Sequence, residues 1–162
     1  MENRAVFPER GAITTVKLID SEDLVQGPEE SDLAWKAREP WAKGLAPIEI
    51  DVELVEREKL VELSHEYLLA DADEDRRKAN LERDGKVVPP STLDGLKEQR
   101  RLNKKAIVLL VRSIRRLTVG HRHSEEFDGE ELAKLVDDAG LLPDVARRAR
   151  AAQSPTPQQL ER

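Results

Sequence analysis

The chain has 162 residues and a formal net charge of -6, with 37% charged and only 3% aromatic residues. This length suits one domain, and a core so poor in aromatic residues favours helices that pack on helices. The absence of cysteine excludes disulfides and thiolate metal sites. No secretory signal pattern opens the sequence, and its longest apolar run, 106–111, is far shorter than the roughly 20 residues that span a bilayer. We therefore expect a cytoplasmic protein with no membrane contact.

Residues 1–46 are predicted to form an N-terminal arm. The β-branched residues of 12–20 favour a short strand. A short helix should run from Ser31 to Arg38, and Pro40 should stop it because proline disfavours helix in the residue before it. Trp35 and Trp41 lie in this segment. They either cover an edge of the core or anchor a partner protein, as tryptophan often does at the centre of an interface.

Residues 47–152 are predicted to form a helical domain. The sequence "PIEIDVEL" alternates apolar and acidic residues, which is typical of a half-exposed strand, and we expect it to pair with 12–20 as a β-hairpin. Helical spacing follows from 55 to about 83, where Val61 and Leu68 widen the apolar stripe. The break at "RDGKVVPPST" then predicts a turn before the next helix.

The sequence "RRLNKKAIVLLVRSIRRL", residues 100–117, contains seven basic residues and no acidic one. On a helical projection its basic and apolar residues separate onto opposite faces, which predicts one long amphipathic helix from about 93 to 118. This helix should pack against 55–83 as a long antiparallel αα-hairpin. This packing should bring four glutamates close to three arginines: Glu56, Glu58, Glu62 and Glu66 near Arg112, Arg115 and Arg116.

Two shorter helices are expected after the long one. Asp128 can cap the first, Gly140 can end it, and Pro143 suits the first turn of the second, which should run to about Ala152. Residues 153–162 are predicted to be a flexible tail. The sequence thus predicts a mainly α fold with a short β-hairpin, and leaves open whether copies of the chain associate.

No motif in the sequence indicates catalysis or a cofactor. His65 opens a metalloprotease-like motif, but Leu69 stands where the second histidine is needed. The acidic run from Asp71 has Arg76 in place of the glycine of a calcium loop. His121 and His123 have no third ligand at a fixed spacing. We therefore expect a non-enzymatic protein without a metal or another cofactor.

The basic residues can serve two kinds of partner. Residues 97–122 carry nine basic residues and one acidic residue, and the rest of the chain is acidic. Nucleic-acid binding through 97–118 is disfavoured because no aromatic side chain interrupts the basic face to stack a base, and the acidic remainder would repel phosphates. We therefore expect protein partners, with these candidate contact residues: Trp35, Trp41, Lys104, Lys105, Arg112, Arg115 and Arg116.

The order of elements in "AIVLLVRSIRRLTVGHRHSEEFDGEELAKLVDDAGLLPDVARRARAAQ", preceded by "IEIDVELVEREKLVELSHEY", resembles the tail assembly chaperones of long-tailed bacteriophages. The resemblance covers about residues 47–152. It implies a small non-enzymatic protein that binds the tape measure protein and tail components in the host cytoplasm, in some cases with a frameshift-extended form. The arm at 1–46 has no counterpart in it, so a small helical virion structural or adaptor protein is the alternative.

Overall fold

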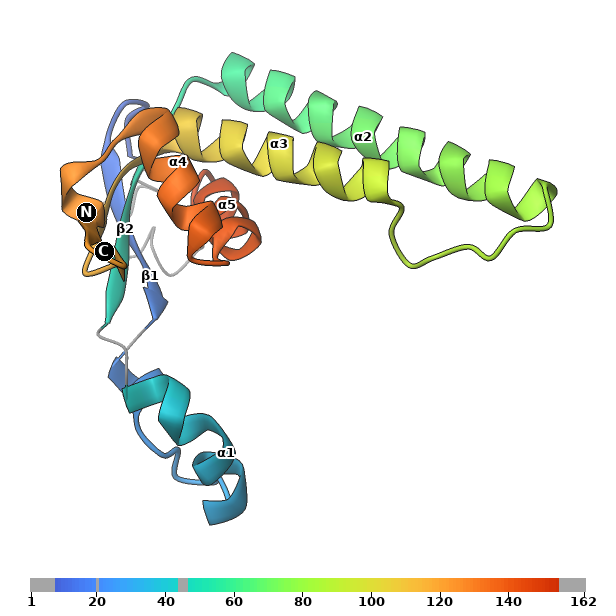
Figure 1. The fold of residues 1–162 in the computed structure, drawn as a ribbon. Helices are drawn as coiled ribbons and strands as arrows, with labels where there is room; N and C mark the ends of the chain where they lie inside the picture. The colour runs from blue at the N-terminus through green and yellow to red at the C-terminus, as the bar shows by residue number, and fades with distance from the viewer. Residues whose placement is uncertain (1–7, 20, 44–46, 155–162) are drawn as a thin grey trace, which may run out of the picture.

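A computed structural model describes residues 8–19, 21–43 and 47–154 of the chain. Within these residues the protein is mainly α-helical, with five α-helices and a small antiparallel sheet. Figure 1 shows a body made of the sheet and the C-terminal helices, from which a pair of long helices projects on one side and α1 on another. None of the described helices is long and apolar enough to cross a membrane.

The sheet has three antiparallel strands in the order β1 (Ile13–Ile19), β2 (Ile48–Glu53) and β3 (Val111–Arg115). Val16, Ile50 and Ile114 occupy one level of the register. The alternating pattern of β2 buries its isoleucines and its valine in the core and turns its acidic residues to the outer face. The central strand thus has one apolar face and one charged face.

The predicted helix 93–118 is wrong in its last third. The helix α3 (Leu93–Leu110) ends where β3 begins, and Arg116 has a left-handed φ of 67°, which an α-helix does not allow. Pairing with β2 explains the change, because β3 satisfies the backbone hydrogen bonds on one side of β2 while Val111 and Ile114 stay buried. The first helix of the C-terminal half therefore continues into the sheet.

The long helices α2 (Arg57–Arg83) and α3 lie side by side and run in opposite directions (Figure 1). We call them, with the loop 84–92, the α2–α3 hairpin. The hydroxyl of Tyr67 donates to Asn103 at 2.7 Å, and the Glu74 carboxylate accepts from the backbone N–H of Thr92 at 3.1 Å. Leu63, like Tyr67, is buried against the body. Beyond Ala70 no described residue of α2 is buried, so the far half of the hairpin stands clear of the core.

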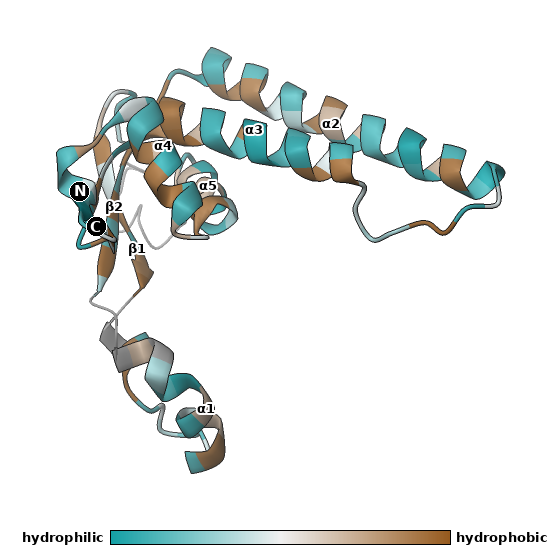
Figure 2. Cartoon of the chain, in the orientation of Figure 1, coloured by the Kyte–Doolittle hydropathy of each residue, from teal (hydrophilic) through white to brown (hydrophobic). Residues whose placement is uncertain are grey.

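The helices α4 (Gly129–Asp138) and α5 (Leu142–Ala151) pack against α3 (Figure 1). Figure 2 shows the apolar residues of the body gathered where these helices meet the sheet. Asp128 occupies the N-cap position of α4, but its side chain makes no capping hydrogen bond. Between β3 and α4 the chain forms β4 (Thr118–Val119), β5 (Arg122–His123) and the 3-10 helix η2 (Ser124–Glu126), where the buried Ser124 hydroxyl donates to the Ile114 carbonyl at 2.6 Å.

Two expectations about the ends of the chain are corrected. The helix α1 (Asp32–Lys43), which follows the 3-10 helix η1 (Ser21–Leu24), continues through Pro40 for three more residues. The flexible tail predicted from residue 153 does not begin there, because Gln153 is buried and hydrogen-bonded. The rest of that tail, 155–162, lies outside the described residues.

Candidate protein-binding surface

Three of the candidate basic residues lie on the outer face or the edge of the sheet. Arg115 contacts Glu49 at 2.9 Å and Asp51 at 3.1 Å, and Arg116 contacts Glu49 at 3.1 Å. Arg112 forms an ion pair with Glu53. The predicted partners of these arginines, glutamates of the helix that follows β2, are wrong, because the acidic residues that pair with them belong to β2 itself. The arginines are therefore already paired within the chain.

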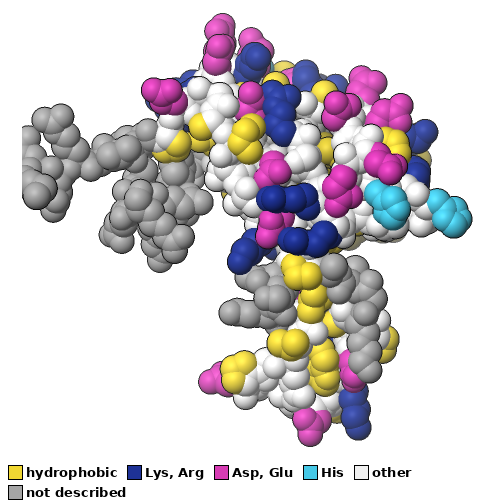
Figure 3. All heavy atoms as spheres, turned by 90° about the vertical axis from the view of Figure 1, so that its left-hand side faces the viewer, with side chains coloured by type: hydrophobic (Ala, Val, Ile, Leu, Met, Phe, Trp, Pro, Cys, Tyr) yellow, Lys and Arg dark blue, Asp and Glu magenta, His cyan; other side chains and the backbone are white. Residues whose placement is uncertain are grey.

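Asp51 is the centre of this charged face. The Ser113 hydroxyl donates to it at 2.7 Å and the Thr15 hydroxyl at 2.8 Å, so one side chain links all three strands. Partial burial acts to raise the pKa of Asp51, but these two hydroxyl groups and Arg115 lower it below its usual value. Figure 3 shows Lys and Arg intermixed with Asp and Glu on this side of the molecule, without a continuous basic face.

The two candidate lysines point to different neighbours. Lys104 lies 3.4 Å from Asp137 on α4, whereas Lys105 lies 2.7 Å from Glu66 on α2. Glu66 is the one predicted glutamate that meets the basic stretch, and it meets a lysine instead of the predicted arginines. All five candidate basic residues thus have a carboxylate partner in the same chain.

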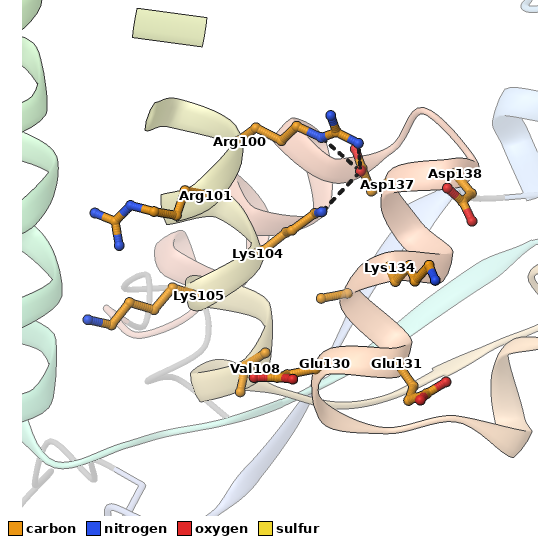
Figure 4. A pocket seen from close by; sticks show the side chains of 11 residues that line it. Arg100, Arg101, Lys104, Lys105, Val108, Glu130, Glu131, Lys134, Asp137 and Asp138 are labelled. Carbon is orange, nitrogen blue, oxygen red and sulfur yellow. Dashed lines mark hydrogen bonds and ion pairs between the residues drawn. The ribbon is translucent and has the colours of Figure 1, made fainter. Parts of the chain in front are cut away.

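A groove lies between α3 and α4 (Figure 4), with a volume of about 570 Å³. Val108 and Ala133 supply its apolar surface. Arg100 and Lys104 lean across it toward Asp137, and the Nε of Arg100 lies 2.8 Å from that carboxylate (Figure 4). The hydrogen bond from Arg100 is the main cause that holds the pKa of Asp137 below its usual value. This ion-pair cluster closes one end of the groove.

The opposite end of the groove offers free charges. Among the described residues, Glu130, Glu131 and Lys134 on α4 make no ion pair, and Glu130 lies near Val108 in Figure 4. Side chains that line one groove with an apolar surface between opposite charges are suited to an amphipathic helix of another protein. The groove could not be predicted from the sequence, because only the fold brings the two helices that form its walls together.

The tryptophans do not join this groove. Trp35 on α1 is half-buried, and the Arg38 guanidinium lies 4.7 Å from the centre of its ring. Arg38 in turn contacts Glu30 at 2.8 Å and the Val25 carbonyl at 2.9 Å, so Trp35 belongs to a small unit of η1 and α1. The Trp41 side chain lies outside the described residues. A role of the two tryptophans in partner binding stays a prediction.

No family model, curated protein or solved structure matches this chain. The functional interpretation therefore depends on the residues and their geometry. Within the described part of the chain, no group of His, Asp and Glu side chains could hold a metal ion.

The exposed apolar residues supply a second signal. Of the eleven large apolar side chains exposed in the described residues, eight belong to the α2–α3 hairpin: Val61, Leu68, Leu69, Val87, Val88, Leu93, Leu96 and Val108. Apolar residues of the loop near its tip are visible in Figure 2. Val61 and Leu68, which the sequence assigned to the core stripe, are each 67% exposed. Exposed apolar residues are thus concentrated on one projecting element of the described structure.

Proposed function

We propose that the chain is a non-enzymatic protein-binding protein that acts as a tail assembly chaperone of a long-tailed bacteriophage. Its partner is the tape measure protein, of which an amphipathic helix binds in the α3–α4 groove. The observation that carries the proposal is the groove itself, which has an apolar floor between two helical walls with free charges of both signs. The partner class comes from the resemblance of residues 47–152 to the chaperone family.

The ion pairs support a protein partner over a nucleic acid. The candidate basic residues, Lys104, Lys105, Arg112, Arg115 and Arg116, are each engaged by a carboxylate. A phosphate backbone would have to displace these carboxylates, and it would meet the acidic surface around them. A helix with a basic residue facing Glu130 or Glu131 and an acidic residue facing Lys134 would leave the ion pairs intact.

The proposal is tested with the purified chain and the tape measure protein of the same phage. Isothermal titration calorimetry should detect binding, and Val108→Glu should weaken it at least about tenfold because a charge would replace the apolar floor. The matched control is Val87→Glu, which introduces the same charge in the loop at the far end of the hairpin. Absence of binding by the unmodified chain, or equal weakening by both variants, would overturn the proposal.

A further inference from the structure

The outer side of α2 carries a regular row of exposed residues. The row follows alternating spacings of four and three, and its members are Val61, His65, Leu68, Ala72, Asp75 and Ala79, all exposed. We call it the α2 seam. It lies about 150° around the helix from the residues that pack against α3. A repeat of 3.5 residues with mostly apolar members is the sequence pattern of a coiled-coil contact, and no described residue of the same chain buries this seam.

We infer that the α2 seam binds the α2 seam of a second copy of this chain, with the two helices antiparallel. When residue 70 of each copy lies at the centre of the contact, every seam residue of one copy faces a seam residue of the other. Leu68 then packs on Ala72 and Val61 on Ala79, so a large side chain always faces a small one. The two polar members also match, because His65 faces Asp75 of the second copy.

Residues beside the seam favour the same arrangement. On one flank of the seam, Glu62 lies opposite Arg76 of the second copy. The exposed Leu69 lies opposite Leu69 of the second copy. On the other flank, the two Asp71 side chains approach each other, but each is turned toward α3, where Gln99 donates to it at 3.3 Å. The antiparallel contact therefore covers three of the exposed apolar side chains of the hairpin.

A parallel pair of helices would fit less well. His65 would then face His65, and Asp75 would face Asp75, which places like charges in the contact. The bodies of both copies would also lie at the same end, because the hairpin projects from one side of the body (Figure 1). In the antiparallel arrangement the two bodies lie at opposite ends.

Among the residues that the structure describes, the body leaves room for the second copy. A groove of about 370 Å³ runs beside the first half of α2, where Arg10, Gln153 and Ser154 line the side opposite the seam residues Val61 and Leu68. Arg10, Arg57 and His65 give this groove a basic rim. In the antiparallel register it receives the second half of α2, where Asp75 faces His65 and Arg83 faces Arg57. The groove therefore contributes space for the second copy, and the contact of His65 with Asp75 selects the register.

The experiment measures self-association of the full-length chain by sedimentation equilibrium. We expect concentration-dependent dimers, and Leu68→Glu should weaken dimerisation at least about tenfold, whereas Val87→Glu should leave it unchanged. His65→Glu and Asp75→Lys should each weaken dimerisation, and the double variant should restore it. The two residues are ten positions apart, about 15 Å along one helix, so only contacts between two chains can produce this rescue.

Two results would overturn the inference. One is a monomer at every concentration, and the other is a dimer that the double variant fails to restore, because such a dimer would use another surface. The seam is separate from the α3–α4 groove, and the measurement needs no partner protein. Failure here therefore leaves the proposed binding of the tape measure protein untouched, and the reverse also holds.

Discussion

Gln153 offers the sharpest test of how the end of the chain holds the fold together. It follows α5 and is only 3% exposed. Its side-chain oxygen accepts from the Val55 N–H at 3.1 Å, and its side-chain nitrogen donates to the Glu53 carbonyl at 2.8 Å. The side chain thus replaces the backbone partner that the end of β2 lacks, and Gln153→Ala should remove both hydrogen bonds at once.

The expected cost follows from the groups left behind. A buried donor or acceptor without a partner costs about 1 to 3 kcal/mol, and this substitution leaves one of each at the end of β2. Water that enters the vacated space should recover part of that cost. We therefore expect Gln153→Ala to lower the free energy of unfolding by about 2 to 4 kcal/mol, which is a large part of the 5 to 15 kcal/mol that is typical of a domain.

Urea unfolding followed by circular dichroism measures this change, with Gln99→Ala as the matched control because the Gln99 side chain makes only an exposed hydrogen bond. Gln153→Glu adds a second check. A carboxylate cannot donate to the Glu53 carbonyl, but a protonated carboxyl can, so the pKa of the new side chain should rise on folding. The loss of unfolding free energy in this variant should therefore shrink as pH falls. A loss below about 1 kcal/mol for Gln153→Ala would refute the reasoning.

Three further predictions concern the α2–α3 hairpin. Gly95→Ala should displace the Glu74 carboxylate, whose place the added methyl would occupy, and should change the stability in thermal unfolding by less than about 1 kcal/mol, because the helix preference of alanine offsets the hydrogen bonds that Glu74 loses. The Thr92 hydroxyl and N–H lower the pKa of Glu74 below 4.5, so the contribution of Glu74 to stability is present above that pH and is lost as pH falls. Glu74→Gln should therefore flatten this acid dependence of the unfolding free energy. Leu102→Ala should cost about 2 to 5 kcal/mol in urea unfolding, whereas Leu96→Ala, at an exposed position of the same helix, should cost less than about 1 kcal/mol.

The parts of the fold with an unambiguous period could be predicted from the sequence. The alternation in "PIEIDVEL" indicates a strand with one acidic face, and β2 has that face. The mainly α class follows from helical spacing over most of the chain. These signals are local, because each residue's face depends only on its neighbours along the same element.

The apolar stripe of α2 shows where local signals stop. Its sequence contains two apolar rows on different sides of the helix, one with Leu63 and Tyr67 and one with Val61 and Leu68, and both have helical spacing. The fold buries the first row and exposes the second. A period shows that residues share a face, but only the number of helices that pack on it decides whether that face is buried. The α3–α4 groove is unpredictable for the same reason.

The passage from α3 to β3 explains why the basic stretch was assigned to one helix. Val111 and Ile114 are both buried although they are three residues apart, a spacing that is typical of a helix and that a regular strand would place on opposite faces. A bulge at Arg112 reconciles the two, because the register places Ile114 beside Ile50 and Val111 beside Val52, with one more residue on β3 than on β2. The extra residue turns the Arg112 side chain to Glu53. The seven basic residues of 100–117 are thereby divided among α3, β3 and the turn at Arg116, which is why separate acidic groups neutralise their charge.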